Sequence, residues 1–230
     1  MSKKPIIGIT MGDAAGIGPE IILKAMAHKE IYEISKPFII GDKKILERAK
    51  RFVDSGLEIE AINEFQLKNI DCEYGKIFCI DLNLLSENLP IGQVSAEAGN
   101  AAFQYLKMAI ELANRKQIDA ICTAPLNKEA LHLGGHKYPG HTEILADLTG
   151  TKDYSMMLSA RKLKVIHVTT HVGLIDAVRM INSDRVYKVI QLAHETLQKS
   201  GIPSPKIAVC GINPHAGENG LFGYGEEEEK

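Results

Sequence analysis

The chain lacks several features that would assign it to a specialised class of protein. None of its apolar runs approaches the roughly 20 residues that a membrane-spanning helix needs, and the first is too short for a secretory signal, so we expect no membrane segment. The net charge of −2 gives no reason to expect nucleic acid or an anionic membrane surface as partner. The four cysteines form no CxxC pair, which argues against a cysteine zinc site. We expect buried free thiols in a cytoplasmic protein.

What the sequence does contain is a regular alternation of two hydrophobic patterns. Short, nearly continuous apolar runs have the length of strands that are covered on both faces. Between them lie segments in which apolar residues recur at the spacing of a helix. Strands that alternate with helices predict a largely parallel α/β sheet. The expected strands cover residues 5–10, 37–40, 76–82, 119–124, 154–160, 163–170 and 206–212.

Two of the helical segments have identifiable ends. In residues 95–117 several alanines, Tyr105 and Leu112 fall on one helical face, and Ser95 is in position to cap the N-terminus. In residues 183–201 the apolar side chains repeat at intervals of three and four, and Gly201 follows as a C-cap. These signals predict two long amphipathic helices.

A glycine-rich stretch, TMGDAAGIGPE at residues 10–20, connects the first expected strand to a helix. Its spacing is neither G-x-G-x-x-G nor that of a P-loop, because no Gly-Lys-Ser/Thr follows. Pro19 and Glu20 are typical of a helix start. The glycines would let backbone N–H groups approach an anion, but they would equally serve a tight turn that binds nothing. The spacing alone leaves both interpretations open.

Two of the eight histidines lie where α/β proteins bind ligands. His171 and His215 each follow the end of an expected strand, and ligands of open α/β sheets bind outside the carboxyl ends of strands. Two imidazoles could share a divalent metal there with a third ligand from elsewhere. The alternative is that each hydrogen-bonds only within its own loop. His167 is expected in the core, because apolar residues flank it.

A further polar pair follows the expected strand at 119–124. Asn127 and Lys128 stand in the stretch TAPLNKEAL. A lysine at a strand end can bind phosphate or carboxylate as a point charge, or transfer a proton if its pKa is lowered. The alternative is a solvated lysine at a helix start.

Taken together, these stretches resemble the family of 4-hydroxythreonine-4-phosphate dehydrogenases, the PdxA-like proteins. The matching pieces are TMGDAAGIGPEI, TAPLNKEA, GHTE, VTTHV and GINPHAGENG, and they occur in the family's order. The resemblance implies two α/β/α subdomains similar to those of isocitrate and isopropylmalate dehydrogenases, with the active site in the cleft between them. It also implies a homodimer with a shared active site, NAD as cofactor, and a divalent metal (Zn, Mg, Mn or Co).

The resemblance assigns roles to individual residues. His141 and Thr142, in GHTE, match the pair that binds substrate. His171 and His215 match two of the three histidines that hold the metal. The third histidine, other substrate-binding residues and most of the NAD-binding region lie in a later segment that is absent here, so we expect an incomplete chain.

Three more residues are candidates for the chemistry. The resemblance makes Asp13 a contact within the cleft and Lys128 an assistant for charge or proton transfer, with Asn127 beside it. Ala14, where many members have proline, favours the branch that acts on D-threonate or D-erythronate 4-phosphate.

The reaction that the resemblance implies is NAD-dependent oxidation and decarboxylation of a 4-phosphorylated 3-hydroxy acid. The substrate would be 4-phosphohydroxy-L-threonine, or D-threonate or D-erythronate 4-phosphate. Two alternatives stay open. One is a non-redox, phosphate acyltransferase-like enzyme on a related fold, and the other is a catalytically incomplete fragment that only binds.

Polar residues and glycines become frequent over residues 123–143, which marks the best candidate boundary. We expect a first α/β subdomain over residues 1–126, to be completed by a later segment, and a second over 127–230 that carries the metal-binding histidines. The glutamates of GYGEEEEK suit a helix start. The chain then stops where an α/β protein would normally continue.

Overall fold

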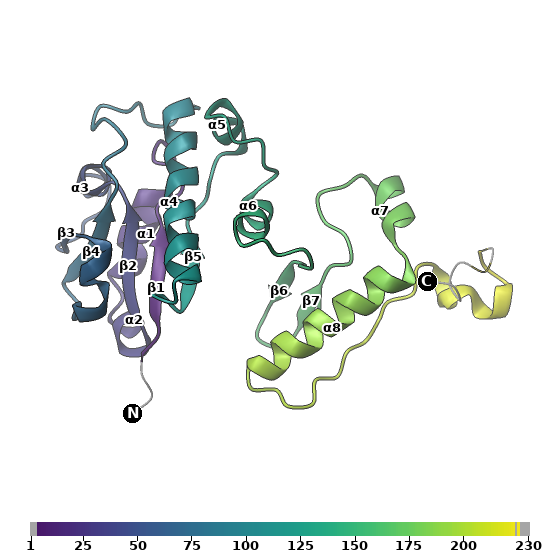
Figure 1. The fold of residues 1–230 in the computed structure, drawn as a ribbon. Helices are drawn as coiled ribbons and strands as arrows, with labels where there is room; N and C mark the ends of the chain where they lie inside the picture. Colours follow the sequence, from purple (N-terminus) through teal and green to yellow (C-terminus); the bar gives the residue numbers. More distant parts are fainter. Residues whose placement is uncertain (1–3, 224, 226–230) are drawn as a thin grey trace. The chain divides into compact units, whose positions relative to one another are not determined.

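The computed structural model describes residues 4–223 and 225 and divides into two compact units, residues 1–150 and 151–230 (Figure 1). The predicted boundary after Leu126 thus falls inside the first unit, and the assignment of functional subdomains stays a prediction. The glutamates expected to start a helix lie outside the described residues. No helix in the described part of the chain is long and apolar enough to cross a membrane.

The first unit is built on a five-stranded parallel sheet, as the sequence predicts. Its strand order is β3-β4-β2-β1-β5. β3, at one edge, was not predicted, because Glu58 and Glu60 interrupt its apolar run. The other four match the predicted runs to within one or two residues. The strands are β1 (Ile6–Thr10), β2 (Lys36–Gly41), β3 (Glu58–Ile62), β4 (Lys76–Asp81) and β5 (Ala120–Thr123).

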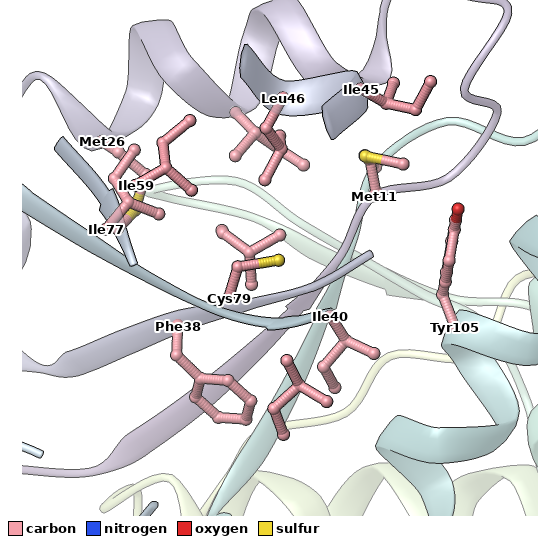
Figure 2. Close-up of a cluster of buried hydrophobic side chains, with 14 of the residues drawn as sticks. Met11, Met26, Phe38, Ile40, Ile45, Leu46, Ile59, Ile77, Cys79 and Tyr105 are labelled. Atoms are coloured by element: carbon pink, nitrogen blue, oxygen red, sulfur yellow. The ribbon is translucent and has the colours of Figure 1, made fainter. Parts of the chain in front are cut away.

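Helices cover both faces of this sheet. The helices α1 (Gly18–Met26) and α3 (Lys43–Ala49) pack against each other on one face, whereas α4 (Ala96–Asn114) lies against β1, β2 and β5 on the other. In Figure 2, Met26 and Leu46 lie on one side of the strands and Phe38 points to the other. All three side chains are fully buried, and such burial stabilises the fold by roughly 1.5–3 kcal/mol per large apolar side chain.

Helix α4 confirms the predicted amphipathic pattern. The Ser95 hydroxyl accepts a hydrogen bond from the Ala98 N–H at 3.3 Å, so this serine is the N-cap. The predicted apolar face, which includes Tyr105 and Leu112, is buried. The shorter elements of this unit are α2 (Lys29–Ile34), a 3-10 helix η1 (Glu64–Asn69), α5 (Lys128–Leu133) and α6 (His141–Leu148).

Helix α5 approaches α4 unusually closely, through a glycine. A Cβ built on Gly99 would lie 1.9 Å from the Ala130 carbonyl oxygen, so only glycine permits this contact. A smaller apolar cluster joins α4, α5 and α6, and it contains Phe103, Leu106, Ile110, Leu131 and Ile144. These contacts explain why residues 127–150 belong to the first unit.

The second unit is smaller in regular structure. Its elements are β6 (Met157–Ser159), β7 (Lys164–Ile166), α7 (Leu174–Met180), α8 (Ser183–Lys199) and a 3-10 helix η2 (Pro214–Gly220). β6 and β7 pair antiparallel. Helix α8 is capped by Asn182, whose side chain accepts from the Arg185 N–H at 2.9 Å, and Gly201 follows its end with a φ of +89°, as predicted.

Two strand predictions in the second unit are wrong. Residues 206–212 form no strand, and β7 ends at Ile166 instead of continuing to 170. His167 therefore lies just past a strand and is half-buried instead of in the core. The expectation of buried thiols holds for Cys72 and Cys79 and is wrong for Cys122 and Cys210, which are exposed. All four thiols are free.

Candidate functional site

The glycine-rich loop packs directly against the segment that follows β5. The Asp13 N–H donates to the Pro125 carbonyl at 2.9 Å. Gly12 has a φ of +68°, and a Cβ on it would lie 2.3 Å from the same Pro125 oxygen. Gly18 is equally constrained, because its Cβ would lie 2.3 Å from the Met11 carbonyl oxygen. The glycines thus permit close backbone contacts, and α1 begins at Gly18 with Glu20 in its first turn, as predicted.

Asp13 lies buried at the centre of this loop, with 8% of its surface exposed. Its Oδ1 accepts a hydrogen bond from the Ala15 N–H at 3.0 Å. Burial raises the pKa of the carboxyl group, and hydrogen bonds from the backbone of Ala15 and Gly16 oppose that shift. Asp13 therefore has the properties of a hydrogen-bond acceptor held in place by its own loop.

An arginine that sequence reasoning missed fixes the other side of the loop. Arg48, in α3, donates to the carbonyl oxygens of Ala14, Glu87 and Leu89 at 3.3, 2.9 and 2.5 Å. The Gly92 N–H donates to the Ala15 carbonyl at 2.7 Å. The segment after β4 is thereby tied to the glycine-rich loop. No motif marks Arg48, since its role depends on three backbone segments that only the fold brings together.

Asn127 and Lys128 lie at the start of α5. The Asn127 side chain accepts from the Ala130 N–H at 3.0 Å, so it caps the helix. The Lys128 side chain reaches the start of α6, since a Cβ built on Gly140 would lie 3.9 Å from Lys128 Cε. The structure thus brings Lys128 to the stretch GHTE.

The first turn of α6 holds the predicted substrate pair. His141 and Thr142 are both half-buried. Burial lowers the pKa of the His141 imidazole and favours its neutral form. Glu143, which was not predicted, has a buried Oε2 without a hydrogen-bond partner among the described residues. That oxygen lies 3.7 Å from the same Gly140 Cβ position that Lys128 approaches.

His171 and His215 lie in the second unit and share an unusual backbone conformation. Both are exposed, with φ of +58° and +59°. Such left-handed conformations are costly outside glycine and occur preferentially at functional sites. His215 stacks on Phe222 with ring centroids 5.6 Å apart, and its Nδ1 lies 3.9 Å from Glu218 Oε2.

These two histidines do not complete a metal site by themselves. Within residues 4–223 and 225, no group of three His, Cys, Asp or Glu side chains could hold a metal ion. Two exposed imidazoles are suitable donors for a divalent transition metal, but further ligands have to come from elsewhere. Their assignment as metal ligands stays a prediction.

Comparisons with known proteins decide the family. The sequence profile described as pyridoxal phosphate biosynthetic protein PdxA matches residues 33–230. The chain belongs to the PdxA family. The family resemblance predicted from the motifs is therefore confirmed.

Individual PdxA-type relatives are similar over nearly the whole chain. A protein of Oceanobacillus iheyensis, provisionally named a D-threonate 4-phosphate dehydrogenase, is 66% identical over 230 residues, which are 100% of this chain and 69% of that protein. The D-threonate 4-phosphate dehydrogenase of Cupriavidus necator is 59% identical over 226 residues, which are 98% of this chain and 67% of that protein.

A solved PdxA-type structure confirms the predicted α/β class. The crystal structure of a 4-hydroxythreonine-4-phosphate dehydrogenase from Burkholderia phymatum matches with a TM-score of 0.88 and 58% identity, over 100% of this chain and 69% of that one. The parallel sheet flanked by helices is thus the architecture of this PdxA-type protein as well.

Proposed function

We propose that this PdxA-family chain is part of an NAD-dependent dehydrogenase that oxidises and decarboxylates a 4-phosphorylated 3-hydroxy acid. The first candidate substrate is D-threonate 4-phosphate. The observation that carries the proposal is the convergence of Lys128 and the GHTE stretch at the start of α6. The two relatives that bear the D-threonate name support the choice of substrate. The solved relative named for 4-hydroxythreonine 4-phosphate keeps that phosphate as the second candidate.

The start of α6 suits an anionic substrate. Backbone N–H groups in the first turn of an α-helix point at a bound anion, and the helix dipole favours negative charge there. Thr142 supplies a hydroxyl donor, and Lys128 supplies a positive charge at the same point. The neutral His141 imidazole supplies one donor and one acceptor. Together they would bind and orient the phosphate or the carboxylate.

The unpartnered Glu143 oxygen fits the same role. A buried carboxylate oxygen without a partner is costly, so a ligand that donates a hydrogen bond to it gains affinity. The hydroxyl groups of a sugar-acid phosphate are such donors. Glu143 would therefore select a polyhydroxylated acid over one with apolar substituents.

The redox chemistry would come from cofactors. When bound, NAD would serve as the hydride acceptor for the substrate C–H, and the hydroxyl proton would be released. The β-keto acid would then lose CO₂, and the carbon that carried the carboxylate would take up a proton. For D-threonate 4-phosphate the product would be dihydroxyacetone phosphate. A divalent metal, held in part by His171 and His215, would polarise the reacting oxygen. A homodimer that acts in the cytoplasm is part of this proposal.

The decisive experiment supplies NAD and Mg²⁺, Mn²⁺, Co²⁺ or Zn²⁺ with D-threonate 4-phosphate, D-erythronate 4-phosphate or 4-phosphohydroxy-L-threonine and follows NADH. We expect NADH with D-threonate 4-phosphate. NADH with another phosphate alone would reassign the substrate. No NADH from the full-length protein with any of them would reject the dehydrogenase proposal. Absence of bound divalent metal would favour the acyltransferase-like alternative.

A further inference from the structure

The sheet of the first unit has a second crevice, away from the glycine-rich loop. β2 and β4 are parallel neighbours. The helix that follows β2, α3, packs with α1 on one face of the sheet, whereas the helix that follows β4, α4, covers the other face (Figure 1). Where the connections of adjacent strands leave on opposite faces, a crevice opens at the carboxyl ends of the strands, and such crevices bind ligands in α/β proteins.

A cavity of about 480 Å³ lies at this point. It is lined by Lys43, the first residue of α3, and by Asp81 and Asn83, at the end of β4. Its volume is within the range of roughly 300–1,000 Å³ that is typical of small-molecule sites. None of the residues predicted from the sequence lines it.

The positive charges of this cavity are only partly neutralised. Lys44 donates to Asn83 Oδ1 at 2.7 Å, and Arg48 donates to backbone carbonyls. The Lys43 ammonium and the Arg51 guanidinium have no hydrogen-bond or ion-pair partner among the described residues. Burial and, after it, the charge of Arg51 lower the pKa of Arg48, so two guanidinium groups repel each other beside the cavity. A bound anion would relieve that repulsion.

Carboxylates supply the complementary part of the lining. Asp81 Oδ1 accepts from the N–H groups of Lys43 and Asn83, both at 3.1 Å, which leaves Oδ2 for other donors. Glu87 also lines the cavity, and Glu47 is paired with Lys50 at 3.2 Å. Lysine and arginine bind phosphate, and carboxylate oxygens accept hydrogen bonds from hydroxyl groups such as those of ribose.

We propose that the β2–β4 crevice binds a phosphate ester that carries neighbouring hydroxyl groups, with Lys43 and Arg51 on the phosphate and Asp81 on the hydroxyls. Two sources share this chemistry: the ribose phosphate of a nucleotide and the phosphorylated hydroxy acid. The nucleotide is favoured, because Lys128 and GHTE already offer the acid a site. If the nucleotide is the dinucleotide NAD, this proposal rests on the proposed function, because NAD is the cofactor proposed there.

Arg48 connects this crevice to the glycine-rich loop. Arg48 lines the cavity, and its guanidinium donates to the Ala14 carbonyl. β1 lies next to β2 in the sheet, so the crevice and the β1–β5 junction are about 10 Å apart at the strand spacing of roughly 4.8 Å. A dinucleotide held by one half in the crevice could therefore extend to the glycine-rich loop.

The test measures binding of AMP, adenosine and D-threonate 4-phosphate by calorimetry, which needs no turnover. The test variants are Lys43→Gln and Arg51→Gln. The control variant is Lys107→Gln, which also removes one positive charge, but from the exposed side of α4. We expect AMP to bind more tightly than adenosine, and each crevice variant to weaken AMP binding about tenfold, the effect of one charge-assisted hydrogen bond. Lys107→Gln should bind AMP as the unchanged chain does, and Arg51→Lys should retain most of the affinity.

The outcomes separate the two sources. If the crevice variants weaken binding of D-threonate 4-phosphate instead of AMP, the phosphate ester is the acid. If both variants, folded by circular dichroism, bind both phosphate esters as tightly as the unchanged chain, the proposal is overturned. A negative NADH assay would leave either result standing, because the dehydrogenase proposal and the crevice are tested by different measurements.

Discussion

At the scale of single residues, burial shifts the pKa values of two candidate site residues of the first unit, His141 and Asp13. His141 lies half-buried in the first turn of α6, and this burial lowers the pKa of its imidazole from the usual 6.5. Asp13, in the glycine-rich loop, shows the opposite direction, because burial disfavours its charged form and so raises the pKa. In both residues, burial thus disfavours the charged form of the side chain.

The first prediction concerns the titration of His141. Between the folded-state pKa and the ordinary value of 6.5, the unfolded chain binds more protons at this site than the folded chain. The contribution of His141 to the free energy of unfolding must therefore fall as the pH drops through that window. An NMR titration of the imidazole should give a pKa below that of the same residue in urea. An equal or higher value in the folded chain would contradict the assignment.

A second residue-scale prediction concerns the buried pair of Asp42 and Tyr105. Asp42 is fully buried at the end of β2, and its Oδ2 accepts from the Tyr105 hydroxyl at 2.6 Å. Tyr105→Phe removes that donor and leaves a buried carboxylate oxygen unpaired, so the free energy of unfolding should fall by about 1–3 kcal/mol. Tyr138→Phe, which loses an exposed hydrogen bond to Asp147, is the control. Urea denaturation that ranks Tyr138→Phe as the more harmful change would refute the argument.

The sequence predicts some of these residues and not others, for a physical reason. Asp13 and His141 stand in contiguous motifs, so a single stretch of chain identifies them. The contacts of Arg48 and the burial of Glu143 Oε2 depend on other segments of the chain. Hydrophobic periodicity and motif spacing contain no information about such contacts.

At the scale of secondary-structure elements, the same reasoning explains which strands could be predicted. Runs covered on both faces, such as β2 and β4, are continuous in apolar residues and were found. In the edge strand β3 only Ile59 and Ile62 are buried, and the two glutamates interrupt the apolar run by which a strand is recognised. Residues 206–212 have the composition of a strand, but none of the described segments pairs with them. A strand needs a hydrogen-bonding neighbour, which its own sequence does not reveal.

The glycine-rich loop provides the prediction at this scale. Gly12→Ala requires an alanine at a φ of +68° and places its Cβ 2.3 Å from the Pro125 oxygen. We expect a loss of more than about 2 kcal/mol in the free energy of unfolding, or a displaced loop. Gly18→Ala meets a collision of the same size with the Met11 carbonyl oxygen, but Gly18 does not have the positive φ that strains an alanine at position 12. It should be harmful but less so.

Gly56→Ala is the matched control for both changes. A Cβ on Gly56 meets nothing within 4 Å, so this substitution should change stability by no more than about 1 kcal/mol. The three variants are compared by urea denaturation. If Gly12→Ala is as stable as Gly56→Ala, the close contact between the loop and Pro125 does not exist in solution.

At the scale of the whole molecule, the two units differ in how much apolar surface they bury. Both apolar clusters lie within residues 1–150. Among the described residues of the second unit, Val189 and Ala193 are the buried apolar side chains, whereas Leu174 and Ile175 of α7 are 79% and 63% exposed. Local stability follows the density of buried apolar contacts. The first unit is therefore expected to hold most of the free energy of folding of this chain.

Hydrogen exchange tests this difference and the proposed homodimer together. Amides of β1, β2 and β4 should exchange slowest, at rates that do not depend on protein concentration, because their protection arises within the first unit. Amides of β7 and α7 should exchange faster in dilute protein. If a second copy covers the exposed apolar residues of α7, their exchange should slow as the concentration rises, since association stabilises by mass action. If the amides of α7 are as protected as those of β2 at the lowest protein concentration, the expected order of exchange rates is wrong. If exchange in α7 does not change with concentration, a dimer does not form through this surface.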